Sequence, residues 1–183
     1  EASWILSRPE LVPIARHVLN PLVEGAQAGE LSHVYSLGGQ PPESRQMLLT
    51  DWVSLLNALM DAHNWDPDRG DYLSAAERVA RQMAERFSDT SSGGFFDTEK
   101  DEEATGYLKL REKPLPENVL AVQGLLKLHQ ATLNDEYRQL AQRALSVYVE
   151  ANRNYGEFAA AYALVVDLFL NSPVEITVEG QPE

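Results

Sequence analysis

The sequence predicts an all-α fold made of repeated antiparallel helical hairpins, and three observations lead to this prediction. Apolar residues recur at three- and four-residue steps over several long segments, which is the spacing of one helix face. Segments that are apolar on most sides alternate with segments that are apolar on one side only. A unit of about 66 residues is repeated along the chain. Such an alternation is typical of a curved array whose inner helices are covered by an outer layer.

Composition narrows the classes of function. The chain has 183 residues, 44% of them hydrophobic, and a net charge of −13 from 15 basic and 28 acidic residues. The acidic balance argues against a nucleic-acid partner, because nucleic acids bind basic surfaces. No apolar run approaches the roughly 20 residues that span a bilayer, so we expect no membrane partner. The absence of cysteine favours a protein made in the cytosol, so we expect a cytoplasmic location. The chain has no cysteine, its four histidines lack metal-ligand spacing and it has no phosphate loop, so we predict neither metal nor cofactor.

The first half of the chain predicts three helices. Ser7 to Glu10 has the spacing of a capping box, so we expect a first helix over about 8–24, interrupted at its prolines. The glycine- and proline-rich segment 25–44 is predicted to hold a short β-hairpin. A second helix, over about 43–64, carries a broad apolar stripe. A third helix begins after Asp71 and is apolar on one side.

The second half repeats this order. A long connection, 88–116, leads to a strongly apolar fourth helix near Pro116, a residue type favoured in the first turn. Asn134 is a predicted N-cap for a one-sided fifth helix. The sixth helix, about 157–170, is apolar nearly all round, so we expect it to be buried on several sides. Residues 174–178 alternate like a short strand at the C-terminus.

The internal repeat covers a whole two-helix unit. Asp51-Trp52-Val53 aligns with Glu117-Asn118-Val119 at an offset of 66, and the same offset pairs His63 with His129. Tyr72 and Tyr137 match at an offset of 65. The alternative is chance similarity between two amphipathic hairpins. The matching helix ends favour a structural role for the two histidines.

Several motifs together resemble one protein family. The chain is similar to the C-terminal region of the thioredoxin-domain proteins related to spermatogenesis-associated protein 20, and the likeness runs from about Pro9 onward. It rests on His33-Val34-Tyr35, Leu49-Thr50-Asp51, Gly93 to Thr98, Arg111 to Asn118, Tyr155 to Leu164 and Pro173 to Val178.

The resemblance implies a thioredoxin-like domain followed by an (α/α) toroid similar to six-hairpin glycosidases and sugar epimerases. Residues 1–183 would then be one helical-hairpin domain, about half of an (α/α)6 toroid, with short β pieces in its long loops and at its C-terminus. The chain begins at Glu1 without a methionine, and we expect it to be the C-terminal part of a longer protein. Thr50 departs from the family, where an acid often precedes the residue at Asp51.

The candidate site lies where the second, fourth and sixth helices begin. Asp51 and Glu117 are the candidate catalytic acids, since carboxylates act as acid and base on sugars. Aromatic side chains stack on sugar rings, and Arg111 suits an anionic group. The predicted substrate-binding residues are His33, Tyr35, Trp52, Phe95, Phe96, Asp97, Arg111, Asn118 and Glu157.

Each of these residues also has a structural interpretation. Acids at positions such as Asp51, Glu117 and Glu157 stabilise a helix dipole without any catalysis. The two phenylalanines after Gly94 suit a packed hairpin corner, Arg111 suits an ion pair, and His33 suits packing. Two functions therefore stay open. One is a carbohydrate-related domain that binds a carbohydrate or other small polar ligand. The other is an interaction module that joins the remainder of the full-length protein or forms a homo-oligomer.

Overall fold

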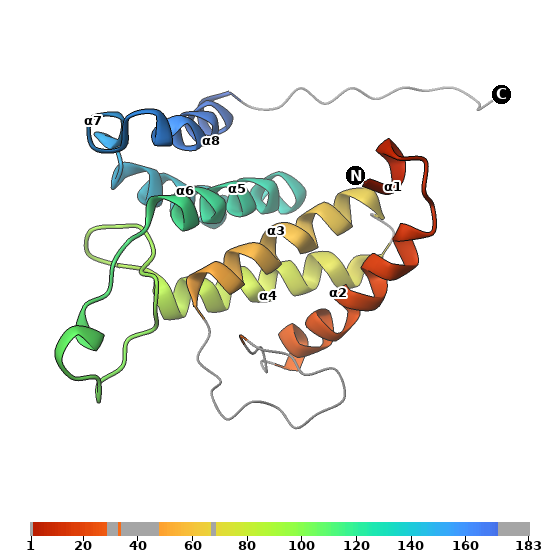
Figure 1. The fold of residues 1–183 in the computed structure, drawn as a ribbon, viewed down its shortest axis with the longest axis horizontal. Coiled ribbons are helices and arrows are strands. Elements are labelled where there is room, and N and C mark those ends of the chain that lie inside the picture. The colour runs from red at the N-terminus through yellow and green to blue at the C-terminus, as the bar shows by residue number, and fades with distance from the viewer. Residues whose placement is uncertain (1, 29–32, 34–47, 67–68, 172–183) are drawn as a thin grey trace.

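A computed structural model describes residues 2–28, 33, 48–66 and 69–171 of the chain (Figure 1). The described residues are all-helical, as the sequence predicts. Their elements in chain order are α1 (Ala2–Ile5), α2 (Leu11–Ala28), α3 (Leu49–Trp65), α4 (Gly70–Phe87), the 3-10 helix η1 (Gly106–Lys109), α5 (Leu115–Thr132), α6 (Asp135–Ser146), α7 (Ala151–Tyr155), the 3-10 helix η2 (Gly156–Ala159) and α8 (Ala160–Leu170).

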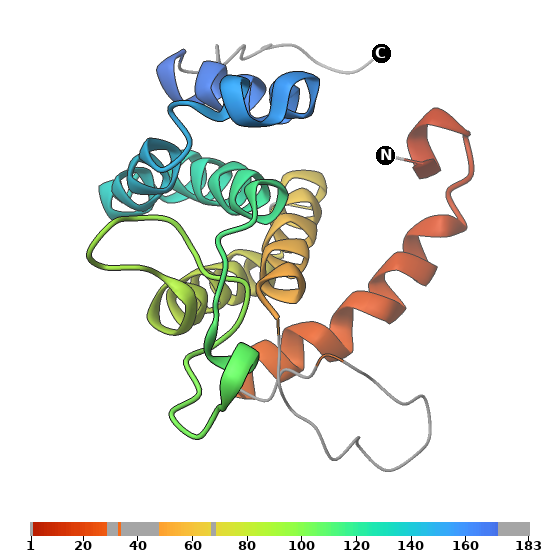
Figure 2. The same ribbon diagram turned by 60° about the vertical axis from the view of Figure 1, so that its left-hand side comes forward.

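The helices form an inner and an outer row. α3, α5 and α8 are neighbours in the inner row, with α5 between the other two. α4 packs against α3, α6 packs against α5, and α2 packs against α4. Figure 2 shows the α3–α4 and α5–α6 pairs in succession, with α8 beyond α5 and α6. This arrangement confirms the alternation of inner and outer helices that the sequence predicts.

The outer helices α4 and α6 bury one face each. On α4 the buried positions run from Tyr72 through Ala76 and Val79 to Phe87, at helical spacing. On α6 they run from Tyr137 to Leu145. Small alanines within both stripes let the backbones of the paired helices approach closely. Asn134 caps α6 as predicted, because its side-chain oxygen accepts a hydrogen bond from the Glu136 N–H at 3.0 Å.

α5 is the centre of the core because it has neighbours on three sides. Its buried residues lie all around the helix. Gly124 lets α5 approach α3 closely, since a Cβ added there would lie 2.8 Å from Leu56 Cγ. Polar contacts also join these two helices. The Lys127 ammonium lies 2.6 Å from the Asp61 carboxylate, and Asn57 donates to the Leu120 carbonyl at 2.9 Å. The sequence repeat pairs Asp61 with Lys127 at the same offset of 66.

The first predicted helix is wrong in its boundaries. Instead of one helix over 8–24, the short α1 precedes α2, and Ser7 between them has a φ of 51°. The Arg8 N–H donates to the Ser3 carbonyl at 2.7 Å, which closes this turn. Pro13 lies in the first turn of α2, where an N–H has no partner inside the helix, and α2 continues through Pro21. The predicted capping box therefore does not begin a helix.

The sixth helix differs from prediction in two ways. The segment 157–170 is divided between η2 and α8. Within α8 only Val165 is buried, although burial on several sides is predicted. Leu164 is 68% exposed and Leu170 is 70% exposed. The sequence shows that this helix is apolar, but burial also needs neighbouring helices, and α8 has them on one side only among the described residues.

Three further expectations concern the connections and the tail. The predicted strand at 174–178 lies outside the described residues. So does the predicted hairpin within 25–44, except for residues 25–28, which end α2, and His33. In the connection 88–116 an isolated antiparallel bridge joins Ser88 to Phe95.

None of the described helices is long and apolar enough to cross a membrane.

Candidate functional site

α3, α5 and α8 begin at the same end of the array, on the left in Figure 1. The connection that precedes α5 lies at this end as well. Asp51 and Glu117 are each the third residue of their helix, and Glu157 lies in η2, just before α8. Asp51 and Glu117 therefore occupy corresponding places in two adjacent inner helices, whereas Glu157 precedes the third.

Asp51 is held by two contacts. Its Oδ2 accepts a hydrogen bond from the Leu48 N–H at 2.9 Å, so the carboxylate caps the start of α3. The His33 Nδ1 lies 2.8 Å from the same oxygen. His33 thus joins Asp51 from a distant part of the chain. The pair has the geometry of an oriented acid, and the capping bond gives Asp51 a structural role as well.

Glu117 has a free oxygen. Its Oε2 is buried and has no hydrogen-bond partner within the described residues. A buried carboxylate oxygen without a partner is costly, so such an atom calls for an explanation. Tyr148 lies close enough to sense this charge: burial raises the pKa of Tyr148, and the charges of Tyr155 and Glu117 raise it further. The Tyr148 hydroxyl donates to the Lys113 carbonyl at 2.8 Å, so it does not bind Glu117.

Asn118 connects α5 to the preceding loop. Its Oδ1 accepts from the Phe95 N–H at 2.7 Å, and its Nδ2 donates to the Phe95 carbonyl at 2.9 Å. Asn118 is only 1% exposed, and Phe95 is buried in the core. The two-way contact satisfies both backbone groups of a buried residue. The polar atoms of Asn118 are therefore occupied inside the protein.

The turn before Phe95 is built around Asp89. Its carboxylate accepts hydrogen bonds from Ser91 and Ser92, and the Lys113 ammonium lies 2.8 Å away. The pKa of Asp89 lies well below its usual value of 3.8. The hydrogen bond from Lys113 is the largest cause, and the hydrogen bonds from the two serines come next. Lys113 also donates to the Gly93 carbonyl at 2.7 Å. This network fastens the turn to the segment that leads into α5.

Phe96, Asp97 and Arg111 are also brought together. The Arg111 guanidinium lies 3.9 Å from the centroid of the Phe96 ring, which is cation–π geometry. The Asp97 N–H donates to the Glu112 carbonyl, and the Asp97 carboxylate accepts from the Glu112 N–H. The Asp97 carbonyl accepts from the Leu49 N–H at 2.9 Å. Asp97 thus ties the loop to the start of α3. Arg111 and Phe96 are half-buried and keep some access to solvent.

The remaining predicted residues have different surroundings. Trp52 is buried beside Phe87, and its Nε1 has no hydrogen-bond partner within the described residues. Glu157 is exposed. Tyr35 lies outside the described residues. Some of the predicted residues are therefore buried in the core, some hold the loop before α5 in place, and some are accessible to solvent.

Sequence reasoning missed Lys113, Asp89 and Tyr148, which organise this end of the molecule. A local signal exists for Asp89 alone, because an aspartate followed by serines favours a side-chain-capped turn. Lys113 acts over 24 residues of sequence and Tyr148 over 35, so no local pattern reveals either partner.

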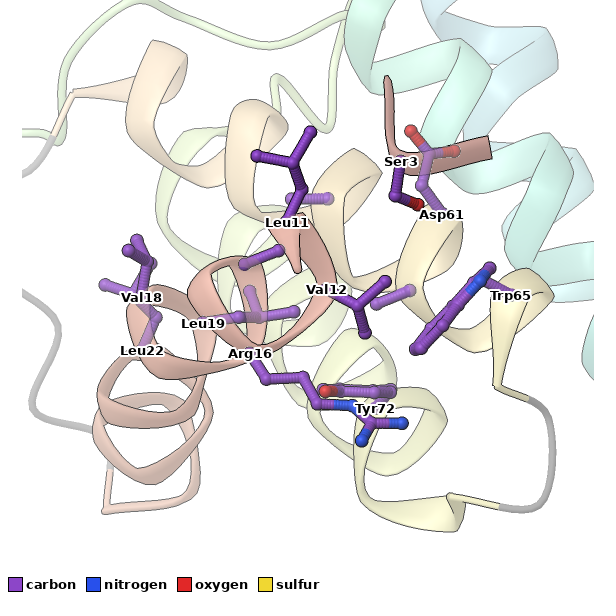
Figure 3. A pocket seen from close by; sticks show the side chains of 13 residues that line it. Ser3, Leu11, Val12, Arg16, Val18, Leu19, Leu22, Asp61, Trp65 and Tyr72 are labelled. Atoms are coloured by element: carbon purple, nitrogen blue, oxygen red, sulfur yellow. The ribbon is translucent and has the colours of Figure 1, made fainter. Parts of the chain in front are cut away.

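A separate apolar groove of about 560 Å³ lies between α2 and α3, with α1 and α4 at its borders (Figure 3). Arg16 stands at its edge, 2.7 Å from the Asp66 carboxylate and stacked on Trp65. None of the predicted site residues that the structure describes lines this groove. Its lining residues are Ser3, Leu11, Val12, Ala15, Arg16, Val18, Leu19, Leu22, Ala58, Asp61, Ala62, Trp65 and Tyr72.

Comparison with known proteins bears on the fold. No protein-family model matches the chain, and no curated protein matches it. Among solved structures, the chain is similar to a selenomethionine derivative of a GH76 alpha-mannanase from Bacteroides thetaiotaomicron, with a TM-score of 0.52 and 15% sequence identity. The match covers 72% of this chain and 37% of the mannanase chain. The mannanase is an (α/α)6 toroid. The chain therefore has the fold of repeated helical hairpins that make up about half of such a toroid.

Proposed function

We propose that this chain is a carbohydrate-related helical domain, which binds a carbohydrate or other small polar ligand where α3, α5 and α8 begin. The buried Oε2 of Glu117, without a partner among the described residues, carries the proposal. A sugar hydroxyl is a suitable donor for such an oxygen. The fold shared with a GH76 alpha-mannanase supports the same class of ligand.

The residues near Glu117 suggest a division of roles. Asp51 is oriented by Leu48 and His33, so it is a second carboxylate in a fixed position. Arg111 offers a cation that is stacked on Phe96 and keeps some access to solvent. These groups are supported by residues of the core and of the loop before α5, namely Trp52, Phe95, Asn118 and Asp97. We propose that this chain binds the ligand and that catalysis requires a longer protein.

Glu117→Gln tests the site. The change keeps the shape of the side chain and removes its charge, so we expect affinity for linear α-mannan oligosaccharides to fall about tenfold or more. Titration calorimetry measures affinity, and thermal unfolding should show little change. Glu136→Gln is the matched control, because Glu136 is an exposed acid in the first turn of the outer helix α6. The proposal fails if the parent chain binds no oligosaccharide, or if both variants lose affinity equally.

We also propose that residues 1–183 are the C-terminal domain of a longer thioredoxin-domain protein. The motifs around Gly93, Arg111 and Tyr155 support this assignment. The size of the native gene product on an immunoblot tests it. A product close to the 20.4 kDa of this chain would contradict the proposal.

A second candidate function is association with another protein surface. The exposed leucines of α8 and the apolar groove beside α2 favour it. Exposed apolar side chains and apolar grooves are features of interaction sites. This function does not depend on Glu117, so the two candidates can be tested separately.

A further inference from the structure

The turn between α1 and α2 is of the kind that ends an α-helix. Ser7 has a φ of 51°, and the Arg8 N–H donates to the carbonyl of Ser3, five residues earlier. A left-handed residue followed by a hydrogen bond of this span is a helix C-terminal motif. α5 also ends at a left-handed residue, Leu133. α1 has only four residues, so it has the ending of a helix but only one turn before it.

The same turn corresponds to the one that joins α3 to α4. Three pairs of residues match at an offset of 61, namely Trp4 and Trp65, Arg8 and Arg69, and Glu10 and Asp71. Both turns hold the same ion pair, because the Nε of Arg8 lies 2.7 Å from the Glu10 carboxylate and the Nε of Arg69 lies 3.0 Å from that of Asp71. α3 ends at Trp65, just before its turn. α1 therefore corresponds to the end of an inner helix.

The face of α2 that borders the groove corresponds to the buried face of α4. At the same offset of 61, four residues of α2 that line the groove match four residues of α4 that are fully buried; these pairs are Ala15 and Ala76, Val18 and Val79, Leu19 and Ala80, and Leu22 and Met83. The main neighbour of α4 is the inner helix α3. Val18, in contrast, is 62% exposed. α2 thus has the packing face of an outer helix, but the inner helix for that face is not among the described residues.

α3 borders the groove with a face that α5 uses for packing. Ala58 of α3 lines the groove and is exposed. At the repeat offset of 66 it corresponds to Gly124, the residue at which α5 approaches Leu56 of α3. α5 therefore uses this face for the inner helix that comes before it in the chain. On α3 the equivalent face borders the groove, where a preceding inner helix would lie.

We propose that α1 is the last turn of an inner helix, and that the residues immediately before Glu1 continue this helix through the groove between α2 and α3. Ser3 of α1 already lines the groove, and α1 lies at the end of the array where α3 ends (Figure 1). The order along the chain agrees, because α3 precedes its outer helix α4 and α5 precedes α6. The proposal rests on the proposed longer protein and names the segment of it that covers the groove, with an apolar face toward α2 and α3.

Amide hydrogen exchange of the native full-length protein tests whether α1 belongs to a longer helix. The first four N–H groups of a helix have no acceptor inside it, so those of Ala2–Ile5 would exchange rapidly if α1 were a separate turn. Within a longer helix each has a carbonyl four residues earlier. We expect these amides to exchange as slowly as residues 62–65, the matched end of α3, and about a hundredfold or more slower than an unstructured chain.

Ala15→Glu tests whether this helix lies in the groove. Ala15 is exposed, whereas the corresponding Ala76 is fully buried against its inner helix. In the full-length protein we expect the thermal midpoint of this domain to fall by about 10 °C, because a charge is buried without a partner. His17→Glu is the matched control, since His17 is an exposed residue of α2 that does not line the groove. Its midpoint should change by less than about 2 °C.

Each other outcome overturns a defined part of the proposal. A longer native protein whose Ala2–Ile5 amides exchange like an unstructured chain would overturn the helix and leave the longer protein intact. Slow exchange in α1 with equal midpoints for Ala15→Glu and His17→Glu would place the helix outside the groove. A dimer in sedimentation velocity that Ala15→Glu alone dissociates would mean that a second copy occupies the groove. A native product of 20.4 kDa would contradict both this proposal and the longer protein.

Discussion

Asn118 illustrates how a residue chosen for its polar chemistry can be committed to the fold. The sequence places it beside Glu117 at the start of an inner helix, where an amide suits a ligand. The structure uses both of its polar ends on Phe95, a residue 23 positions earlier. A contact of that separation leaves no local pattern, so sequence reasoning finds the residue but not its partner.

Asn118→Ala should destabilise the protein strongly. The change leaves the N–H and carbonyl of the buried Phe95 without partners, and we expect the free energy of unfolding to fall by about 2–4 kcal/mol. Urea unfolding followed by circular dichroism measures it. Asn154→Ala, at an exposed position, should have little effect. A loss for Asn118→Ala below about 1 kcal/mol would contradict the anchoring role.

The contact between Asp89 and Lys113 predicts a pH dependence. The pKa of Asp89 in the folded protein lies below 3.8, so this contact stabilises the fold above that pH and is lost as pH falls further. Asp89→Asn and Lys113→Met should each be less stable than the parent near neutral pH. Each should also lose less stability than the parent on acidification from about pH 5 to about pH 3. Equal losses in parent and variants would count against the contact.

At the scale of elements, periodicity predicts the helices that have one solvent face and one packed face. α4 and α6 match prediction because hydrophobic spacing alone decides which face is buried. The starts of α5 and α6 also match, since a proline and an asparagine mark them locally. The segment around Ser7 does not match, because a residue with positive φ interrupts a favourable capping sequence.

Gly124→Ala should destabilise the α3–α5 contact although alanine favours helices. The added Cβ would lie 2.8 Å from both Cγ and Cδ2 of Leu56, which is fully buried. Overpacking costs about 1–3 kcal/mol, and the gain in helix propensity returns about 1 kcal/mol, so we expect a net loss of about 1 kcal/mol. Gly70→Ala is the control, because open space surrounds Gly70. Denaturant midpoints for the two variants should move in opposite directions.

At the scale of the whole molecule, the sequence predicts the array but not which of its surfaces are covered. The alternation of apolar patterns and the 66-residue repeat predict the inner and outer rows. The exposure of α8 could not be predicted, because an apolar helix is buried only where neighbours exist. The direct contact between His33 and Asp51 could not be predicted either, although both residues are in the predicted set, because they are 18 positions apart and no local pattern links them.

The packing of successive helices has a consequence for how the chain is made. α3 meets α4, and α5 meets α6, so most contacts join segments that are close in sequence. Chains with such local contacts fold quickly, because little loop entropy is lost before contacts form. Each hairpin can therefore pack as it leaves the ribosome, before the next one has been synthesised. α8 is the last of these helices to emerge, so its apolar face is exposed to the cell only after its inner-row neighbours are already in place.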